Sequence, residues 1–361
     1  MLYRGDEEVS AVRGALIKAI EGCNLSPQEA ESVLLEVLDG SATDAQIGAL
    51  LVALKLKGET YEELAGFARG LMKKALRVNL SGGRLMDTAG TGGDRFKTFN
   101  VSTAAAFVLA AGGLRVAKHG NRSVSSTSGS ADLMEAFGVR LEVDPQIVAA
   151  CVEGAGIGFM YAPTFHPALK RVAGIRRELG FRTIFNMLGP LVNPAGVKRQ
   201  LLGVAEPFMV DVMAKALNEL GVEFACVVHG TEGMDEVSIN SPTIMALVDS
   251  GAVKHVTLTP RELGLESAEP SQLTCRDVRD SALTVYRILS GRSGLGDPKT
   301  RLVAANAAVG FMVGGVVDSV SEGVQLALST IESGRAADRL RELVRLSGGD
   351  PSKLEAIERV V

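Results

Sequence analysis

Two polar, glycine-rich regions hold the residues whose types and spacing could do chemistry. The first joins Gly90–Asp94 (GTGGD) to Asn100–Thr103 (NVST), and the second is Lys118–Ser126 (KHGNRSVSS). Glycine lets the backbone approach a ligand closely and adopt positive φ, and successive N–H groups in such turns form a concavity that binds anions. A helix start near Ser102 would add free amides and the positive end of a helix dipole. Together the two regions predict a phosphate-binding site.

The surrounding pattern predicts elements that position these regions. Arg84–Thr88 is typical of a short strand, and Thr103–Ala111 is typical of a helix that ends at Gly112-Gly113. Leu114–Ala117 follows as the next strand and delivers Lys118 to a loop. This order is a strand–loop–helix–strand unit of a parallel sheet, where ligands bind at the carboxyl ends of the strands.

Two common phosphate motifs do not match. A Walker A loop needs a glycine before its Lys-Thr pair, but Phe96 precedes Lys97-Thr98. The dinucleotide fingerprint needs a glycine where Arg95 stands. These differences argue against a kinase, an ATPase or a Rossmann dehydrogenase. An ordinary glycine turn is the alternative for the first region alone, and the second region favours phosphate binding.

Composition limits the partners. The 361 residues are 46% hydrophobic with a net charge of −4, so there is no global attraction to nucleic acid or to an anionic membrane. Tryptophan is absent and aromatic residues make up 4%, which leaves few platforms for stacking bases. The four cysteines have no metal-ligand spacing and do not suggest a disulfide framework. No signal-peptide pattern or membrane-spanning run is visible, and we expect a cytoplasmic protein.

The chain divides by pattern into a helical part, residues 1–80, and an α/β part, residues 81–361. Helix starts in the first part follow Ser26, Thr43 and Thr60, each with Glu or Gln three residues later. Short strands and helices then alternate, which predicts a parallel sheet. The strands expected here are 139–141, 157–161, 200–204 and 225–228, with an antiparallel pair at 243–248 and 253–258. Further helices are expected at 207–220, 278–289, 300–313, 320–333 and 336–346.

At this point the chain resembles a known family. GTGGD, NVST, KHGNRSVSS and Asn186–Pro194 (NMLGPLVNP) occur in the order found in anthranilate phosphoribosyltransferases, and the resemblance covers nearly the whole chain. It implies an α/β fold of the nucleoside phosphorylase/phosphoribosyltransferase-like type, with a large parallel-sheet domain and a small all-helical N-terminal domain joined by part of 166–190. It also implies a homodimer through the helical domain.

The implied reaction moves the phosphoribosyl group of phosphoribosyl pyrophosphate (PRPP) to the amine of anthranilate, in tryptophan biosynthesis, with Mg²⁺ as cofactor. No acid or base residue is assigned, because an aniline nitrogen is already neutral near pH 7. His119 is a candidate base, but we favour a structural or substrate-lining role. For Thr98–Thr103, simple N-capping is an alternative that is compatible with phosphate binding. The resemblance assigns PRPP binding to Gly90, Gly93, Asp94, Thr98, Asn100, Val101, Ser102, Thr103, Lys118, His119, Gly120, Asn121, Arg122, Ser123, Val124, Ser125, Ser126 and Ser130, the last of which is expected to cap a helix.

Anthranilate recognition is expected from Arg176, with Gly90 and Asn121 assigned by the resemblance. A guanidinium can bond both oxygens of a carboxylate at once. The alternatives are an exposed helix arginine paired with a glutamate, and Arg177 as the clamp. NMLGPLVNP downstream shifts the choice to Arg176.

Metal binding is expected from Asp235 and Glu236, at the end of a strand, with Ser102 added by the resemblance. Adjacent carboxylates suit Mg²⁺, which takes oxygen ligands. Glu232 competes for this role, and a solvated acidic turn is the other alternative. For His166, His229 and His255 we expect structural roles.

Three departures from the family pattern stand out: Arg95, Gly174 and Thr274–Asp277. They leave the proposed ligands in place, and the last puts local loop geometry in doubt. Two rival functions are a pyrimidine nucleoside phosphorylase and a non-catalytic nucleic-acid-binding relative. The intact KHGNR and Asp235-Glu236 argue against the first, and the net charge of −4 and the intact GTGGD argue against the second.

Overall fold

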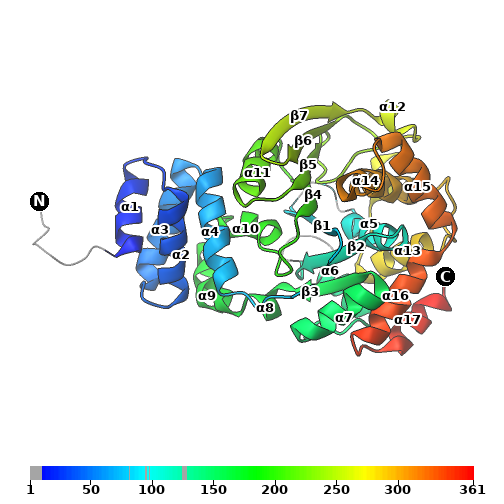
Figure 1. The fold of residues 1–361 in the computed structure, drawn as a ribbon, viewed down its shortest axis with the longest axis horizontal. Helices are drawn as coiled ribbons and strands as arrows, with labels where there is room; N and C mark the ends of the chain where they lie inside the picture. Colours follow the sequence, from blue (N-terminus) through cyan, green and yellow to red (C-terminus); the bar gives the residue numbers. More distant parts are fainter. Residues whose placement is uncertain (1–9, 81, 94–95, 97, 124–127) are drawn as a thin grey trace, which may run out of the picture. The chain divides into compact units, whose positions relative to one another are not determined.

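The computed structural model describes residues 10–80, 82–93, 96, 98–123 and 128–361. The described residues form two compact units, coloured along the chain in Figure 1. The first unit contains the residues up to Ala75 together with His166–Val192. The second contains Leu76–Phe165 and Asn193–Val361. The chain therefore enters the second unit, leaves it after Phe165 and returns to it at Asn193.

The first unit is helical. Capping boxes begin α2, α3 and α4, as the sequence predicted, with Ser26, Thr43 and Thr60 as N-caps. Helix α4 packs closely on α2, and Gly66 allows this approach: an added Cβ there would lie 2.6 Å from the Cβ of Ala30. The elements of this unit are α1 (Ala11–Ile20), α2 (Pro27–Leu38), α3 (Asp44–Lys57), α4 (Tyr61–Lys73), α9 (Lys170–Leu179) and α10 (Phe185–Leu188), with 3-10 turns at Pro167–Leu169 and Gly189–Leu191.

The second unit contains a sheet that, over the described residues, has seven strands in the order β3-β2-β1-β4-β5-β6-β7. The strands from β3 to β5 in this order run parallel, and β6 and β7 add the antiparallel pair that the sequence predicted. The strands are β1 (Leu85–Gly90), β2 (Arg115–Gly120), β3 (Ile157–Tyr161), β4 (Arg199–Gly203), β5 (Phe224–Gly230), β6 (Thr243–Asp249) and β7 (Ala252–Leu258). The fold class expected from the sequence is confirmed.

Helices surround this sheet. Helix α5 packs against β1, β2 and β3, whereas α11 packs against β5, β6 and β7. The direction of strand addition reverses between these two connections, and right-handed crossovers then place their helices on opposite faces. The helices are α5 (Val101–Ala111), α6 (Ser130–Ala136), α7 (Pro145–Ala155), α8 (Ala162–Phe165), α11 (Phe208–Glu219), α12 (Pro260–Leu263), α13 (Val278–Leu289), α14 (Pro298–Gly314), α15 (Val320–Glu332), α16 (Arg335–Leu346) and α17 (Pro351–Glu358), with a 3-10 turn at Pro270–Leu273.

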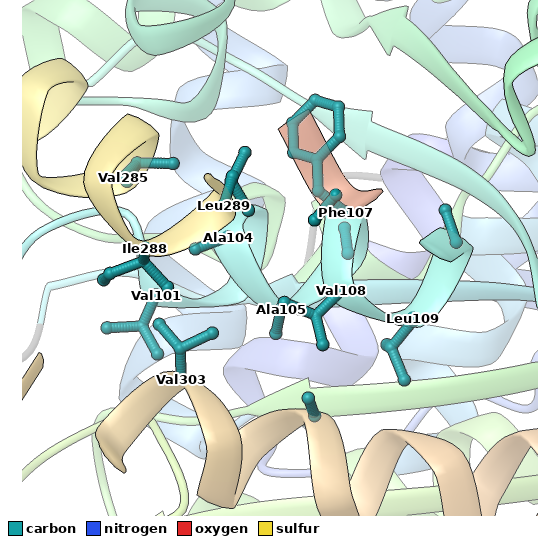
Figure 2. Packing of buried hydrophobic residues seen from close by; sticks show 14 of the residues in the cluster. Val101, Ala104, Ala105, Phe107, Val108, Leu109, Val285, Ile288, Leu289 and Val303 are labelled. Carbon is teal, nitrogen blue, oxygen red and sulfur yellow. The ribbon is translucent and has the colours of Figure 1, made fainter. Parts of the chain in front are cut away.

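Helix α5 is the centre of the main core. Every residue of α5 except Ser102 is buried. Figure 2 shows its apolar side chains beside those of α13, such as Ile288, and of α14, such as Val303. Each fully buried Val, Leu, Ile or Phe side chain contributes roughly 1.5–3 kcal/mol of transfer free energy. The core therefore fixes the N-terminus of α5, which belongs to the first polar region of the sequence.

Three features differ from the sequence expectations. Strand β2 continues to Gly120, so Lys118 lies within a strand and not in a loop. No strand forms at Val139–Leu141 among the described residues: Val139 and Leu141 are buried in the core from a loop, where the Arg140 amide donates to Ser347 Oγ at 3.2 Å. Helices α7 and α17 were not predicted. Within the described ranges, no helix combines the length and the apolar character needed to cross a bilayer.

Candidate functional site

The glycine loop begins at the point where the sheet changes its direction of growth. Strands β2 and β3 lie on one side of β1, and β4 and β5 lie on the other. Gly90 ends β1 in register with Gly203 at the end of β4, and the Thr91 amide donates to Gly203 O at 3.0 Å. Gly92 and Gly93 then adopt φ of 63° and 85°, which favour glycine. Such a switch point at the carboxyl ends of parallel strands is where α/β sheets bind ligands.

Asp235 lies directly against this loop. Its Oδ2 accepts a hydrogen bond from the Gly92 amide at 3.2 Å. A Cβ added to Gly90 would lie 2.9 Å from the same oxygen, and one added to Gly203 would overlap the Asp235 backbone. The glycines at the ends of β1 and β4 are therefore what lets the turn after β5 bring its carboxylate to the loop. Asp94 and Arg95 lie outside the described residues.

The three acidic residues of that turn have different surroundings. Both carboxylate oxygens of Glu232 accept hydrogen bonds, one from the Ser238 hydroxyl and one from the Ser241 hydroxyl. Glu232 therefore braces its own turn. Asp235 contacts the glycine loop, and the charge of Glu236 acts on buried Lys118. This difference favours the Asp235-Glu236 pair over Glu232 as the acidic groups that face a ligand.

The side chains of Asp235, Glu236 and Ser102 have the donor chemistry that Mg²⁺ prefers. Among the described residues, no cluster of three or more His, Cys, Asp or Glu side chains could hold a metal ion by itself. Two carboxylates and the Ser102 hydroxyl are hard oxygen donors, which match Mg²⁺. Because Mg²⁺ keeps several waters and is usually completed by substrate phosphates, a protein site with few ligands suits it.

Asn100 joins the start of α5 to two other segments. It occupies the N-cap position, but its side chain makes no capping bond to the helix. Instead Nδ2 donates to Ser128 O at 3.0 Å, and Oδ1 accepts from Ser281 Oγ at 2.8 Å. The first-turn amides of an α-helix have no acceptor within the helix, and the Asn100 side chain does not supply one for α5. The hydroxyl oxygen of Thr103 is buried there and has no hydrogen-bond partner among the described residues.

Thr98 forms a β-bridge with Thr274. This contact ties the first polar region to the segment Thr274–Asp277, which departs from the family pattern. Asp277 then caps α13 by accepting from the Asp280 amide at 2.8 Å. The segment is therefore integrated into the second unit, between the bridge at Thr98 and the helix that carries Ser281.

A buried polar cluster lies behind the glycine loop. Lys118 and Asp87 are 2% and 0% exposed, and the Lys118 ammonium donates to the backbone oxygen and the hydroxyl of Thr88. Oδ2 of Asp87 accepts from Asn193 Nδ2 at 2.8 Å, and Oδ1 accepts from the His119 amide at 3.4 Å. Burial lowers the pKa of Lys118 and raises that of Asp87, and the attraction between their charges opposes both shifts.

The sequence placed Lys118 in this region but did not identify its neighbours. Asp87, Thr88 and Asn193 were not singled out as functional residues. Asn193 belonged to the NMLGPLVNP motif, and Asp87 precedes GTGGD in a predicted strand. The available signal was Asp87, a charged residue inside a predicted apolar strand, since a buried polar group needs a hydrogen-bond partner.

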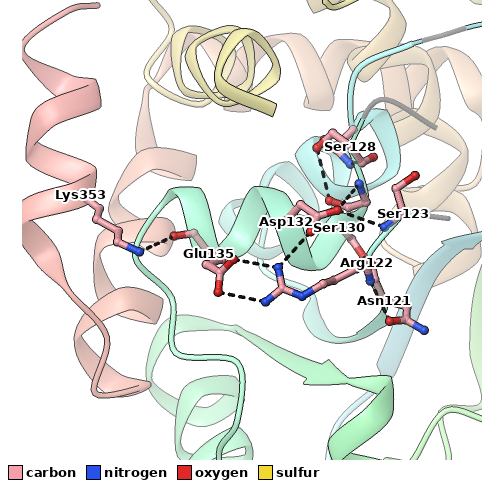
Figure 3. Close-up of polar contacts among 10 residues, drawn as sticks. Asn121, Arg122, Ser123, Ser128, Ser130, Asp132, Glu135 and Lys353 are labelled. Atoms are coloured by element: carbon pink, nitrogen blue, oxygen red, sulfur yellow. Dashed lines mark hydrogen bonds and ion pairs between the residues drawn. The ribbon is translucent and has the colours of Figure 1, made fainter. Parts of the chain in front are cut away.

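The second polar region runs from β2 into α6. His119 is 7% exposed within β2, and Ser130 opens α6 as its first residue while Gly129 is the N-cap. The expected helix cap at Ser130 is therefore wrong: its hydroxyl donates to Asn121 O at 3.4 Å. Figure 3 shows Arg122 directed toward Asp132 and Glu135. Val124, Ser125 and Ser126 lie outside the described residues.

Arg176 belongs to α9 of the first unit. The described candidates for PRPP and metal binding belong to the second unit. Its guanidinium carbon lies 5.4 Å from the centroid of the Phe185 ring, and Phe185 also packs edge-on against Phe67. Burial lowers the pKa of Arg176, although an arginine stays charged at neutral pH. Arg177 is exposed, as is Gly174 one turn earlier. The half-buried, stacked side chain distinguishes Arg176 from its neighbour.

The three histidines outside the two polar regions make structural contacts. The His229 ring contacts Val204 O and the His166 ring contacts Val192 O, each at 2.9 Å. Exposed His255 lies 3.2 Å from Asp211 Oδ1. These contacts agree with the structural roles expected from the sequence.

Comparison with known proteins matches both parts of the chain. Residues 82–337 match the family model described as the glycosyl transferase family, a/b domain, and residues 13–75 match the helical bundle domain of the same family. An anthranilate phosphoribosyltransferase of Pelotomaculum thermopropionicum is 45% identical over 337 residues, covering 93% of this chain and 97% of the relative. That of Persephonella marina is 47% identical over 333 residues, covering 92% and 98%.

Solved structures agree. The crystal structure of anthranilate phosphoribosyltransferase from Thermus thermophilus superposes with a TM-score of 0.86 at 42% identity, covering 92% of this chain and 99% of that one. The enzyme from Saccharomyces cerevisiae in complex with PRPP and Mg gives a TM-score of 0.84 at 28% identity, covering 93% and 98%. With its glycine loop, KHGNR segment and mostly parallel sheet, the chain belongs to the anthranilate phosphoribosyltransferase family of phosphoribosyl-transferring enzymes.

Proposed function

We propose that the chain carries out the reaction of its family, the transfer of the phosphoribosyl group from PRPP to the amine of anthranilate, which releases pyrophosphate and serves tryptophan biosynthesis. The observation that carries this proposal is the contact between Asp235 and the Gly92 amide at the switch point of the sheet. It brings an acidic group, the glycine loop and a helix start to one end of the strands. Related enzymes of this name support the choice of substrates.

PRPP binds, in this proposal, to the two polar regions of the second unit. Gly90–Asp94 contacts pyrophosphate and ribose, and Thr98 with Asn100–Thr103 holds phosphate through the amides and hydroxyls at the start of α5. Lys118–Ser126 and Ser130 wrap the phosphoribosyl part. What supports this assignment is that Asn100 Nδ2 donates to the backbone oxygen of Ser128, just after the second region, while its Oδ1 accepts from Ser281 of α13. Asn100 thus links the first region to the segment that follows the second.

Lys118 contributes charge from behind the loop. Its ammonium is buried and bonded to Thr88, so it acts through the low-dielectric interior and not as an exposed contact. A fixed positive charge there favours the polyanionic substrate and stabilises the leaving pyrophosphate.

Asp235, Glu236 and Ser102 would hold Mg²⁺. When bound, the ion neutralises charge that develops on the leaving pyrophosphate. The chain's own part is to present oxygen donors next to the glycine loop, so that substrate phosphates complete the coordination. The complex of the yeast enzyme with PRPP and Mg supports the choice of Mg²⁺ as the ion.

Arg176 is the proposed clamp for the carboxylate of anthranilate, with Asn121 and Gly90 as further contacts. Stacking on Phe185 restricts the guanidinium, which lowers the entropy lost when it binds a planar carboxylate. The yeast enzyme is also known in complex with 4-fluoroanthranilate, at 27% identity.

Positioning and leaving-group stabilisation carry the reaction. The aniline nitrogen is neutral at working pH, so the reaction needs no strong base. His119 lies within β2 and is 7% exposed, and its backbone amide faces Asp87, which favours a lining role. Bringing two substrates together in the right geometry can supply about 7–11 kcal/mol of the barrier.

We also propose that the first unit is the dimerisation domain and that the enzyme works in the cytoplasm. Exposed apolar side chains on α1 and α3 support the first point, with Ile20 and Leu56 being 71% and 83% exposed. Such side chains are common where partners bind. Light scattering on Leu56→Asp should show more monomer than the unchanged protein. The absence of disulfides among the four cysteines is compatible with a reducing compartment.

The test of the reaction is the loss of anthranilate fluorescence with PRPP and Mg²⁺, each omitted in turn. The proposal expects loss only in the complete mixture, with pyrophosphate as the second product. If the folded protein leaves anthranilate unchanged but cleaves thymidine or uridine with inorganic phosphate, it is instead a nucleoside phosphorylase.

A further inference from the structure

The carboxylate of Asp132 joins two backbone positions, Ser123 in the second polar region and Gly129 after it. Asp132, in the first turn of α6, accepts the Ser123 amide at 3.0 Å and the Gly129 amide at 2.9 Å, both on Oδ2. Its Oδ1 accepts from Arg122 Nη1 at 3.0 Å (Figure 3). The two amides stand six positions apart in the sequence. Asp132 therefore holds the entrance and the exit of the segment 123–129 together; we call this arrangement the neck.

The backbone itself is adapted to the neck. A Cβ added to Gly129 would overlap the Ser123 nitrogen and lie 2.7 Å from Asn121 O. Gly129 has an ordinary negative φ, so glycine is required here by the close approach of two backbone segments and not by a special conformation. Any larger residue would push the entrance and exit apart.

The exposed side chain of Arg122 pairs with residues beside the neck. It forms a two-pronged pair with Glu135, at 2.8 and 3.0 Å, and its guanidinium lies 5.7 Å from the Tyr161 ring centroid. With Glu135 and Tyr161 it lines a surface hollow of about 410 Å³. Its positive charge faces Asp132, which reduces the cost of placing a carboxylate beside a phosphate-binding segment.

The neck also connects to the first polar region. Ser128, just inside the exit, gives its carbonyl oxygen to Asn100 Nδ2 at 3.0 Å. Asn100 is in turn the residue before α5. Opening the neck would therefore shift Ser128 relative to the start of α5.

We infer that Asp132 is a positioning residue for PRPP binding: it closes the neck and so fixes the spacing between the two phosphate-binding regions. The inference rests on the proposed function, since segment 118–126 is the proposed phosphoribosyl contact. Asp132 acts through Ser123, Gly129 and Arg122. It is not a phosphate ligand itself, because a carboxylate repels phosphate and its oxygens are already occupied by donors.

The experiment compares Asp132→Asn with Glu135→Gln. Asparagine keeps the size but presents an NH₂ group to one set of donors, so the neck opens. We expect the KM for PRPP and its dissociation constant, measured by calorimetry without anthranilate, to rise about tenfold in Asp132→Asn, since a hydrogen bond to a charged group is lost. The KM for anthranilate should change less than about twofold. Glu135→Gln, which weakens only an exposed pair, should resemble the unchanged protein.

A second variant keeps the inference testable if Asp132→Asn folds poorly. Gly129→Ala should raise the KM for PRPP in the same way, whereas Gly296→Ala, at a position with open space for a Cβ and no positive φ, should not. Equal PRPP binding in Asp132→Asn and the unchanged protein, with both active, would overturn the inference while leaving the proposed function intact. If the unchanged protein neither binds PRPP nor consumes anthranilate, the proposed function itself fails.

Discussion

Oδ2 of Asp87 accepts a hydrogen bond from Nδ2 of Asn193 at 2.8 Å, with both residues 6% exposed or less. The same Nδ2 donates to Ala117 O, also at 2.8 Å. Asn193 is the residue at which the chain returns to the second unit. It therefore bridges β1 and β2 behind the glycine loop, and it gives the NMLGPLVNP motif a structural task in the phosphate-binding unit.

Asn193→Ala should lower the free energy of unfolding by about 1–3 kcal/mol, because two buried acceptors lose a donor. Urea unfolding measures the change. Asn24→Ala is the control, since Asn24 is exposed and accepts from Lys57 Nζ at 2.8 Å; its effect should be smaller than that of Asn193→Ala. Equal effects of the two variants would mean that the bridge contributes little.

Arg176→Ala should damage the use of anthranilate more than the binding of PRPP, because only anthranilate loses its carboxylate partner. We expect the KM for anthranilate to rise about tenfold or more, in line with the loss of a charge-assisted bond. Arg177→Ala, on the exposed side of the same helix, is the control and should change neither constant. An equal rise in both substrate constants for Arg176→Ala would argue against the clamp.

Acidification should weaken the neck. Burial raises the pKa of Asp132, but donation from Ser123, Gly129 and Arg122 outweighs it, so the folded pKa lies below the ordinary 3.8. A carboxyl with a depressed folded pKa contributes stability above its unfolded pKa, and this stability is lost as pH falls through the folded value.

The unchanged protein should therefore be more stable than Asp132→Asn near neutral pH, and the difference should shrink below pH 3.8. Melting temperatures across an acid series follow this difference. A constant gap at every pH would show that the charge of Asp132 is not what stabilises the neck.

Thiol reactivity offers an independent check of the fold. Cys23 is exposed, whereas Cys151, Cys226 and Cys275 are buried. Burial raises the pKa of Cys151 to about 11 and that of Cys226 further, which suppresses their thiolates. In the native protein a chromogenic disulfide reagent should titrate one thiol quickly, and all four should react after unfolding. Fast reaction of a second thiol would contradict the packing described for the second unit.

Local patterns predicted much of this fold. The capping boxes at Ser26, Thr43 and Thr60 form as expected, because a cap and its partner lie within four residues of each other. Helix α13 has the predicted bounds, Val278–Leu289. The alternating apolar residues Val139 and Leu141 misled the strand prediction, since burial against a core produces the same pattern without a sheet partner.

The site was predictable where its residues are close in sequence. GTGGD and KHGNR each reveal their chemistry in one short run. The sequence could not show that Asp235 reaches the Gly92 amide 143 positions away, or that Asn193 meets Asp87 over 106 positions. The sequence also did not show that the Arg122 side chain pairs with Asp132 and Glu135, which the fold brings near.

The most direct test of the account is a calorimetric titration of PRPP at a series of Mg²⁺ concentrations. Mg²⁺ should tighten PRPP binding in the unchanged protein. The double variant Asp235→Asn/Glu236→Gln should need about tenfold more Mg²⁺ for the same affinity, a difference of about 1.4 kcal/mol. Glu232→Gln, which alters the carboxylate that braces its own turn, should behave like the unchanged protein. An unaltered Mg²⁺ dependence in the double variant would contradict the assignment of these carboxylates at the glycine loop.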